Sequence, residues 1–427
     1  MEGNSQIIFA TAVFLICYAI IISEKIHRTV VALLGGMLVI IGGVINQEQA
    51  IEAIDFNTIG LLVGMMVIVG IARNSGLFEY LAVRAAKQSK GDPVKIMISL
   101  TLITALLSAL LDNVTTVLLI VPITFSIAKS LEISPMPILF AEVLASNIGG
   151  TSTLIGDPPN IMIGSATGLG FMDFVVNLAP VIVVILLVTV YLLKLIYRKQ
   201  LVTRSELKAN IMRMDPNSEI KDSVLLKKSL SIIGLVIFGF FIHQYVHLES
   251  ATIALTGAAL LLLITRDDPE HALGAVEWPV LFFFAGLFIL VGALEHVGVI
   301  EWVALAGLKL TGGELLPTGM LILWLSAIAS AFVDNIPFVA TMIPLIEDMG
   351  RLGGIADLNP LWWSLSLGAC LGGNGTIIGA SANVVVAGMA EKQGFHWTFV
   401  GFMKVAFHLM IVSILISTVY LYFFYLI

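Results

Sequence analysis

Two acidic residues, 222 positions apart, carry the side chains best suited to chemistry. Asp112 and Asn113 lie in an apolar stretch that ends at a proline, and Asp334 and Asn335 repeat the pattern. A carboxylate near the centre of a bilayer costs about 2.5 to 3.5 kcal/mol or more. Two such groups in one membrane chain indicate solute binding or proton transfer, so transport is the predicted function. Alternatively, both acids are structural caps of hairpins, bonded to neighbouring backbone amides.

Two further segments, 147–160 and 372–383, interrupt apolar helices with glycines and small polar residues. Proline lacks an N–H group and glycine weakens a helix, so both helices should unwind there. Unwound helices offer N-termini to polar or anionic oxygens and carbonyls to cations. With the hairpin tips, these segments supply the predicted site: Asp112, Asn113, Thr115, Thr116, Asn147, Gly150, Thr151, Ser152, Thr153, Asp157, Asn160, Asp334, Asn335, Gly373, Asn374, Thr376, Ser381 and Asn383. The hydroxyls among them could instead bond only carbonyls of their own helices.

The charge of this site is asymmetric. Asp157 has no acidic counterpart, because Ala380 takes the matching position, and it could alternatively be only a helix-start residue before two prolines. Asp112, Asp157 and Asp334 make three carboxylates with no certain basic residue, and Lys404 is the one possible counter-ion. This balance favours proton or cation exchange, or a neutral polyhydroxy solute, over a multiply charged anion. No metal site is certain, although sodium could bind at the hairpin tips.

Composition sets the class of protein that must hold these residues. Of 427 residues, 58% are hydrophobic and 12% charged, and the mean hydropathy is +1.02. This hydrophobic fraction exceeds what the core of a soluble protein can bury, so the sequence predicts an all-α polytopic protein in a lipid bilayer. We expect neither an enzyme nor a nucleic-acid-binding protein, and no cofactor.

The 222-residue offset extends over most of the chain and includes a match of Asp55-Phe56 with Glu277-Trp278. It predicts two repeats, 1–200 and 229–427, joined by a linker at 201–228. Each repeat should have five crossings and a re-entrant hairpin, at about 94–130 and 318–349, and a broken helix, at about 136–166 and 361–390. An odd number of crossings inverts the second repeat relative to the first.

Basic residues gather in alternate loops, with the densest group between Lys194 and Lys228. The positive-inside rule therefore predicts a cytoplasmic 198–228 loop and both termini outside. The predicted location is the plasma (inner) membrane.

The stretches Leu111–Thr116 and Ile148–Asn160, the latter ending in Gly-Asp-Pro-Pro-Asn, resemble the permease branch of the ion transporter superfamily. That branch contains arsenite permease (ArsB), NhaD-type sodium/proton antiporters and the P protein. More distantly, the layout is similar to divalent anion/sodium symporters, whose two Ser-Asn-Thr signatures correspond to Asp112–Thr115 and Asp334–Pro337. Here an acid replaces each serine and the second threonine is absent, which argues against sodium-coupled dicarboxylate uptake.

The resemblance implies an elevator mechanism, in which hairpins and broken helices slide against a scaffold within a homodimer. It further implies proton-coupled efflux of arsenite or antimonite, or of a similar small inorganic solute, with an energising ATPase subunit as a possible partner. Sodium/proton antiport is the alternative, and sodium-coupled di- or tricarboxylate transport a further one. An intramembrane aspartyl protease is a competing class, but neither a Tyr-Asp nor a Gly-x-Gly-Asp motif surrounds Asp112 or Asp334.

Overall fold

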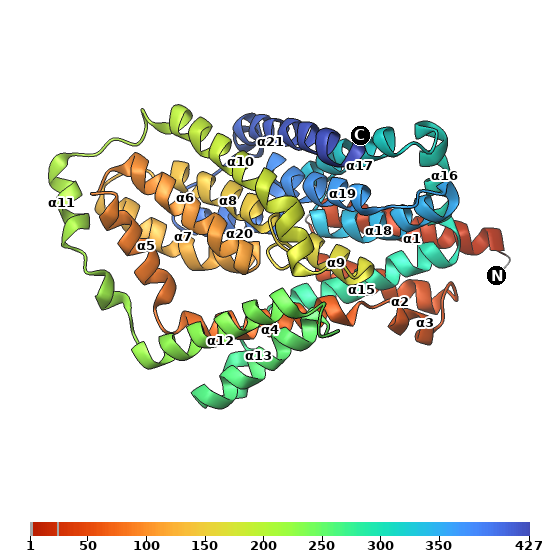
Figure 1. Ribbon diagram of the computed structural model, residues 1–427, viewed down its shortest axis with the longest axis horizontal. Coiled ribbons are helices and arrows are strands. Elements are labelled where there is room, and N and C mark those ends of the chain that lie inside the picture. Colours follow the sequence, from red (N-terminus) through yellow and green to blue (C-terminus); the bar gives the residue numbers. More distant parts are fainter. Residues whose placement is uncertain (1–2, 24) are drawn as a thin grey trace.

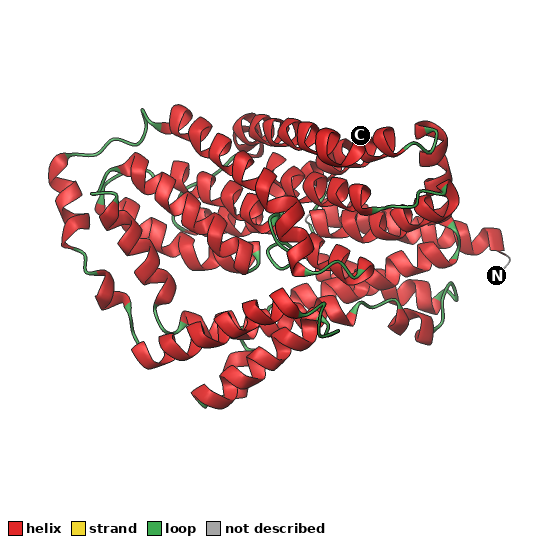
Figure 2. Ribbon diagram, in the orientation of Figure 1, coloured by secondary structure: helices red, strands yellow, loops and turns green. Residues whose placement is uncertain are grey.

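The computed structural model describes residues 3–23 and 25–427, and these residues form helices and loops without strands (Figure 2). Nine of the described helices are long and apolar enough to cross a membrane. The predicted all-α polytopic membrane fold is therefore confirmed.

The two halves of the chain contain equivalent helices in the same order. The first half contains α1 (Gly3–Ser23), α2 (Arg28–Ile41), α3 (Gln47–Glu52), α4 (Phe56–Arg73), α5 (Leu77–Gln88), α6 (Pro93–Leu110), α7 (Asn113–Ser130), α8 (Met136–Gly150), α9 (Pro158–Thr167) and α10 (Phe171–Tyr197). The second half contains α12 (Ser223–Ile242), α13 (Ser250–Thr265), α14 (Pro269–Leu273), α15 (Trp278–His296), α16 (Val299–Thr311), α17 (Leu315–Phe332), α18 (Asn335–Gly353), α19 (Asn359–Gly372), α20 (Ser381–Lys392) and α21 (Phe399–Leu421).

The hairpins α6–α7 and α17–α18 extend from opposite ends of the molecule toward its middle (Figure 1). Each turns sharply because an aspartate caps the returning helix. Asp112 accepts the N–H of Thr115 at 2.8 Å, and Asp334 accepts the N–H of Ile336 at 3.1 Å. The capping interpretation of both acids is therefore correct. It does not exclude binding, because each carboxylate has a second oxygen.

The broken helices lie directly against these hairpins. α8 ends at Gly150 and α9 begins at Pro158, and an irregular stretch of chain connects them. α19 likewise ends at Gly372, and two short 3-10 turns, Gly373–Gly375 and Ile377–Gly379, lead into α20. Prolines are well tolerated at the first position of α9, where a helix does not need their N–H. The predicted unwinding occurs in both halves.

The two halves interlock instead of folding side by side. α4 of the first half packs against α13 of the second, and α15 of the second packs against α2 of the first. Glycines permit this contact, because a Cβ on Gly64 would lie 2.5 Å from the backbone of Ala254 and one on Gly286 would lie 2.5 Å from that of Ala32. Each half therefore completes the packing of the other.

The connection between the halves is more ordered than its polar sequence indicates. α11 (Ser205–Arg213) lies within it and buries Ile211 against α5 and α7. α12 begins at Ser223, inside the segment predicted as linker, because Asp222 caps the N–H groups of Val224 and Leu225. We call the end of the molecule that carries this connection the linker side.

Candidate functional site

Both hairpin tips and the start of α9 meet at a closed central cavity. Its polar lining comprises Arg28, Asp112, Asn113, Asp157, Glu277, Asn335 and Ser381, and its apolar lining includes Leu62, Met66 and Val280. The cavity volume is about 20 Å³, room for about one water molecule. Asp157 is fully buried and Asp112 is 7% exposed. The centre is therefore acidic and closed to solvent in this conformation.

Asp157 connects the first broken helix to the tip of the second hairpin. The amide of Asn335 donates to Asp157 Oδ1 at 3.3 Å and to Oδ2 at 3.5 Å, and both distances are long for a hydrogen bond. Asp157 is the N-cap residue of α9, as the helix-start interpretation expects, but its side chain makes no capping bond to that helix. Its carboxyl group remains free to gain or lose a proton.

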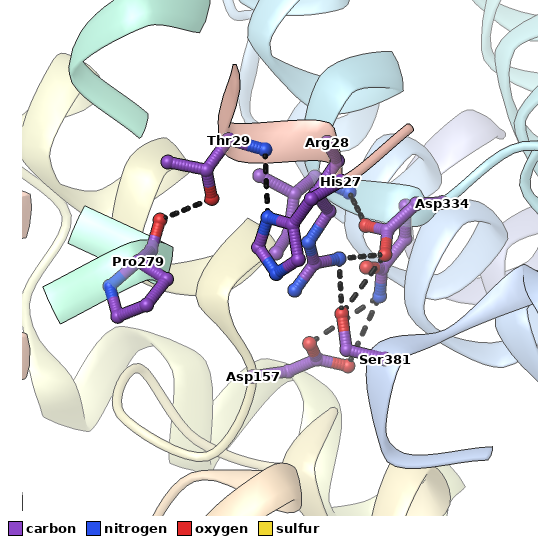
Figure 3. A network of polar contacts seen from close by, with 9 residues as sticks. His27, Arg28, Thr29, Asp157, Pro279, Asp334 and Ser381 are labelled. Carbon is purple, nitrogen blue, oxygen red and sulfur yellow. Dashed lines mark hydrogen bonds and ion pairs between the residues drawn. The ribbon is translucent and has the colours of Figure 1, made fainter. Parts of the chain in front are cut away.

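Arg28 is the basic residue that the sequence analysis did not assign to the site. Its Nη1 donates to Asp334 Oδ2 at 2.6 Å and to Ser381 Oγ at 2.7 Å, and Ser381 in turn donates to Asp334 at 2.9 Å (Figure 3). The guanidinium also lies 4.9 Å from the ring centroid of Phe283. Ion pairing and the aromatic face both stabilise a cation at this position.

The expectation of a site without a certain basic residue was therefore wrong. In the sequence Arg28 looks like an ordinary basic residue of a loop, but α2 begins at this residue and places it beside the hairpin tip. Lys404, the predicted counter-ion, is exposed on α21 and does not line the cavity. The neighbourhood of the site thus holds four carboxyl groups, Glu277 and the three aspartates, and one guanidinium.

Buried asparagines join the two broken helices behind the cavity. Asn113 donates to Asn147 at 3.0 Å, and Asn147 donates to both Asn374 and Asn383 at 2.9 Å. Asn160 and Asn383 then donate to main-chain carbonyls of their own unwound segments, at 2.8 to 3.1 Å. The amide side chains of Asn147, Asn160, Asn374 and Asn383 therefore hold the broken helices in place. They also satisfy backbone groups that have no partner within a helix.

Most of the predicted hydroxyls also bond backbone carbonyls. Thr153 and Thr376 occupy matching positions and donate to the carbonyls of Ala109 and Ala331 at the hairpins. Thr151 and Ser152 donate to carbonyls of α8, within their own segment.

The remaining predicted residues lie around the cavity and not in its lining. Thr116 is fully buried and its hydroxyl has no partner among the described residues, whereas Thr115 lines a neighbouring hollow. Gly150 and Gly373 permit close approach of Gly156 and Gly379. The structure thus brings Asp112, Asn113, Asp157, Asn335 and Ser381 to the cavity and places Asp334 beside it.

Hollows on the linker side lead toward the cavity. One, of about 430 Å³, lies between α4, α7 and α14, and another, of about 360 Å³, lies between α1, α20 and the tip that joins α17 to α18. A third, of about 340 Å³, is bordered by α5, α7 and the chain around Asp215; it shares residues with the first hollow but none with the cavity. At the opposite end, a hollow of about 400 Å³ between His243 and Leu169 shares no residue with the cavity. The centre is closest to solvent on the linker side.

Inverted hairpins and broken helices that meet at a buried polar centre define a membrane transporter. Residues 18–368 match the model of the citrate transporter family (CitMHS), and the chain belongs to this family. This finding, with the relatives below, confirms the predicted membership of the ion transporter superfamily.

The relatives cover almost the whole chain. A Mycobacterium tuberculosis protein described as an uncharacterized transporter is 43% identical over 420 residues, 97% of this chain and 98% of that protein. A 46 kDa membrane protein of Mycobacterium leprae is 40% identical over 425 residues, covering 98% and 99%. The human P protein is 37% identical over 502 residues, covering 98% of this chain and 60% of the P protein.

A solved structure shares the fold. The YdaH transporter of Alcanivorax borkumensis superposes with a TM-score of 0.57 at 16% identity, covering 87% of this chain and 86% of that one. At this identity the similarity concerns the fold alone.

Proposed function

We propose that the protein is a proton-coupled secondary transporter that works by alternating access. The observation that carries this proposal is the small acidic cavity between two inverted hairpin tips, which shares lining residues with two hollows on the linker side. For a solute to cross the membrane, such a site must open to one side and then, after a conformational change, to the opposite side. We further propose that the hairpins and broken helices move against the early helices of each half, as an elevator, within a homodimer in the plasma membrane.

The coupling proton is assigned to Asp157. This carboxyl group is fully buried, its two contacts with the Asn335 amide are long, and no cation is bonded to it in the described structure. A carboxyl group in such a place can carry a proton in one conformation and release it in another, because neutral and charged forms have very different burial costs. Sodium at the hairpin tips is the alternative coupling ion.

The charge balance selects the substrate class. Four carboxyl groups surround the centre and one guanidinium partly offsets them, so the site favours neutral or cationic solutes over free polyanions. Arsenite and antimonite are neutral trihydroxy species that need hydrogen bonds and not a cationic pocket. We therefore propose efflux of arsenite or antimonite, with an ATPase subunit as the proposed partner, and sodium/proton antiport as the alternative.

A carboxylate solute is the second candidate. Arg28 is a suitable partner for a carboxylate, and the matched family model is described as a citrate transporter. The surrounding acids would repel a free tricarboxylate, so such a solute would have to enter protonated or with a bound cation.

Flux measurements in proteoliposomes test these proposals. Arsenite, sodium and citrate, the last with and without magnesium, are each offered under an imposed pH gradient. We expect arsenite flux that the pH gradient drives, and Asp157→Asn should abolish the drive while a matched surface variant, Glu48→Gln, retains it. Flux of sodium or citrate alone would overturn the arsenite assignment, and flux insensitive to any pH gradient would overturn proton coupling.

A further inference from the structure

Glu277 holds a position that no other residue of the site shares. It immediately precedes α15 and lines the closed cavity, the 430 Å³ hollow and the 360 Å³ hollow. Among the residues that line these three spaces, only Glu277 borders all of them. Its side chain is partly exposed, whereas Asp157 in the same cavity is fully buried. Glu277 therefore stands between solvent on the linker side and the buried acids.

The matching acid of the first half shows what a structural role at this position looks like. Asp55 caps α4 through the N–H groups of Asn57 and Thr58, and it accepts a further bond from the hydroxyl of Ser165 at 2.8 Å. Glu277 makes no side-chain capping bond to α15. The acids at matching positions of the two halves thus have different roles: Asp55 caps its helix, whereas the carboxyl group of Glu277 makes no capping bond to α15.

Acidic and basic side chains from several helices surround Glu277. Arg28 of α2, Asp112 of the first hairpin and Asp157 of α9 border the cavity, and Asp334 of the second hairpin borders one hollow beside His27. Arg73 of α4, Asp267 and His271 border the other hollow. Neighbouring carboxylates disfavour a common fully ionised state, whereas Arg28 keeps one negative charge stabilised. Such a group exchanges protons readily with other acids of the same cavity.

We propose that Glu277 is the proton-transfer residue that connects the linker-side solution to Asp157. In the step toward the centre, the O–H bond of protonated Glu277 breaks and a water in the cavity that both residues line takes the proton, and that water gives a proton to a carboxylate oxygen of Asp157. Glu277 is left as a carboxylate, and water in the adjoining hollow protonates it again. The return step reverses each transfer, so no other reactant is needed. This inference rests on the proposed proton coupling, and Glu277 acts on the proton and not on the solute.

The test separates net transport from exchange. Proteoliposomes with wild type, Glu277→Gln, Glu277→Asp or Glu48→Gln are assayed with arsenite, or with sodium if wild type carries sodium. One assay measures flux driven by a pH gradient. The other measures counterflow at equal pH and equal solute on both sides, a mode that needs no proton release. An internal pH dye reports proton movement in both.

We expect Glu277→Gln to lower gradient-driven flux and proton movement by about tenfold or more, while counterflow stays within about twofold of wild type. Glu277→Asp should retain part of the driven flux, and Glu48→Gln should match wild type. Unchanged driven flux in Glu277→Gln overturns the inference, and so does equal loss of both modes, which would mark a binding or structural residue. If the wild-type protein shows no response to a pH gradient, the proposed proton coupling itself is overturned. That result differs from both outcomes of the Glu277→Gln variant described above.

Discussion

Arg28 joins the start of α2 to the tip of the second hairpin through Asp334 and to the start of α20 through Ser381. The guanidinium is 25% exposed and the carboxylate 11% exposed, so the pair is partly shielded from water. Partial shielding strengthens the attraction but adds a desolvation cost, so the net contribution depends on keeping both partners. Tyr18 of α1 contacts the same tip, donating to the carbonyl of Pro337 at 2.5 Å. Helices α1 and α2 thus hold this hairpin by two polar contacts.

Removal of one partner should destabilise the protein more than removal of both. Arg28→Gln leaves Asp334 without its cation and should lower the free energy of unfolding by about 1 to 3 kcal/mol. The double variant with Asp334→Asn should recover part of that loss, which gives a coupling energy of about 1 kcal/mol. Unfolding of all four proteins in detergent measures this cycle. Strictly additive effects would show that the ion pair contributes nothing.

The acids of the site could be predicted from the sequence, whereas their basic partner could not. Asp112 and Asp334 recur at a fixed offset in apolar stretches, and charge in such places is costly enough to be informative. Arg28 lies in a short polar connection that looks like an ordinary basic loop. One signal was present: the apolar run that follows Arg28, residues 30–45, is short for a membrane span, which is consistent with a start within the bilayer. Glu277 had its own signal, the match with Asp55, but the offset alone does not distinguish a cap from a free acid.

Close contact between hairpins and broken helices depends on glycine. A Cβ on Gly149 would lie 2.1 Å from the carbonyl oxygen of Ala105, and one on Gly372 would lie 2.5 Å from that of Ala327. These are matching positions of the two halves. Main-chain atoms cannot move aside as side chains can, so α6 and α8, or α17 and α19, would have to separate to admit a methyl group.

Gly149→Ala should therefore destabilise the fold by about 1 to 3 kcal/mol and reduce the yield of monodisperse protein. Gly388→Ala is the matched control, because a Cβ there meets nothing within 4 Å in the structure. Alanine is the better helix former, so the control should be neutral or more stable by up to about 1 kcal/mol. Thermal unfolding and size-exclusion profiles in one detergent compare them. Equal stability of the two variants would contradict the packing argument.

The helical elements were largely predictable, because particular residue types mark the positions where helices are interrupted. Aspartate before each returning helix and proline or glycine at each unwound segment mark the interruptions directly. The pairing of α4 with α13 and of α2 with α15 was not predictable, since an apolar helix face does not specify which other apolar face covers it. Order in α11 was missed because its single buried residue, Ile211, gives no periodic signal.

The two hollows that share lining residues with the cavity both lie on the linker side, so we expect this conformation to open toward that side. A cysteine at position 115, which lines the 430 Å³ hollow, should react with a membrane-impermeant thiol reagent added from the linker side. Leu169→Cys, which lines the hollow at the opposite end, is the control and should react from the other side. The native residues Cys17 and Cys370 are buried and should contribute little background.

Solute and a pH gradient should change the labelling rate of Thr115→Cys, because turnover alternates closed and open states, and leave that of Leu169→Cys less affected. Mass spectrometry of intact protein from right-side-out and inverted vesicles measures both rates and also assigns the linker side to a compartment. Labelling of Thr115→Cys at equal rates from both sides would contradict alternating access.

The exchange of helices between halves also constrains how the chain is made. When α4 leaves the ribosome, the helix that covers its Gly64 surface has not been synthesised, and α2 must likewise wait for α15. Ala254 follows Gly64 by 190 residues and Gly286 follows Ala32 by 254 residues, which corresponds to about 10 to 50 seconds of translation at ordinary rates. During that time two apolar grooves are covered only by lipid or by a chaperone of the insertion machinery. Biogenesis, more than turnover, is therefore where truncated or slowly translated forms of this chain should be most vulnerable to quality-control proteolysis.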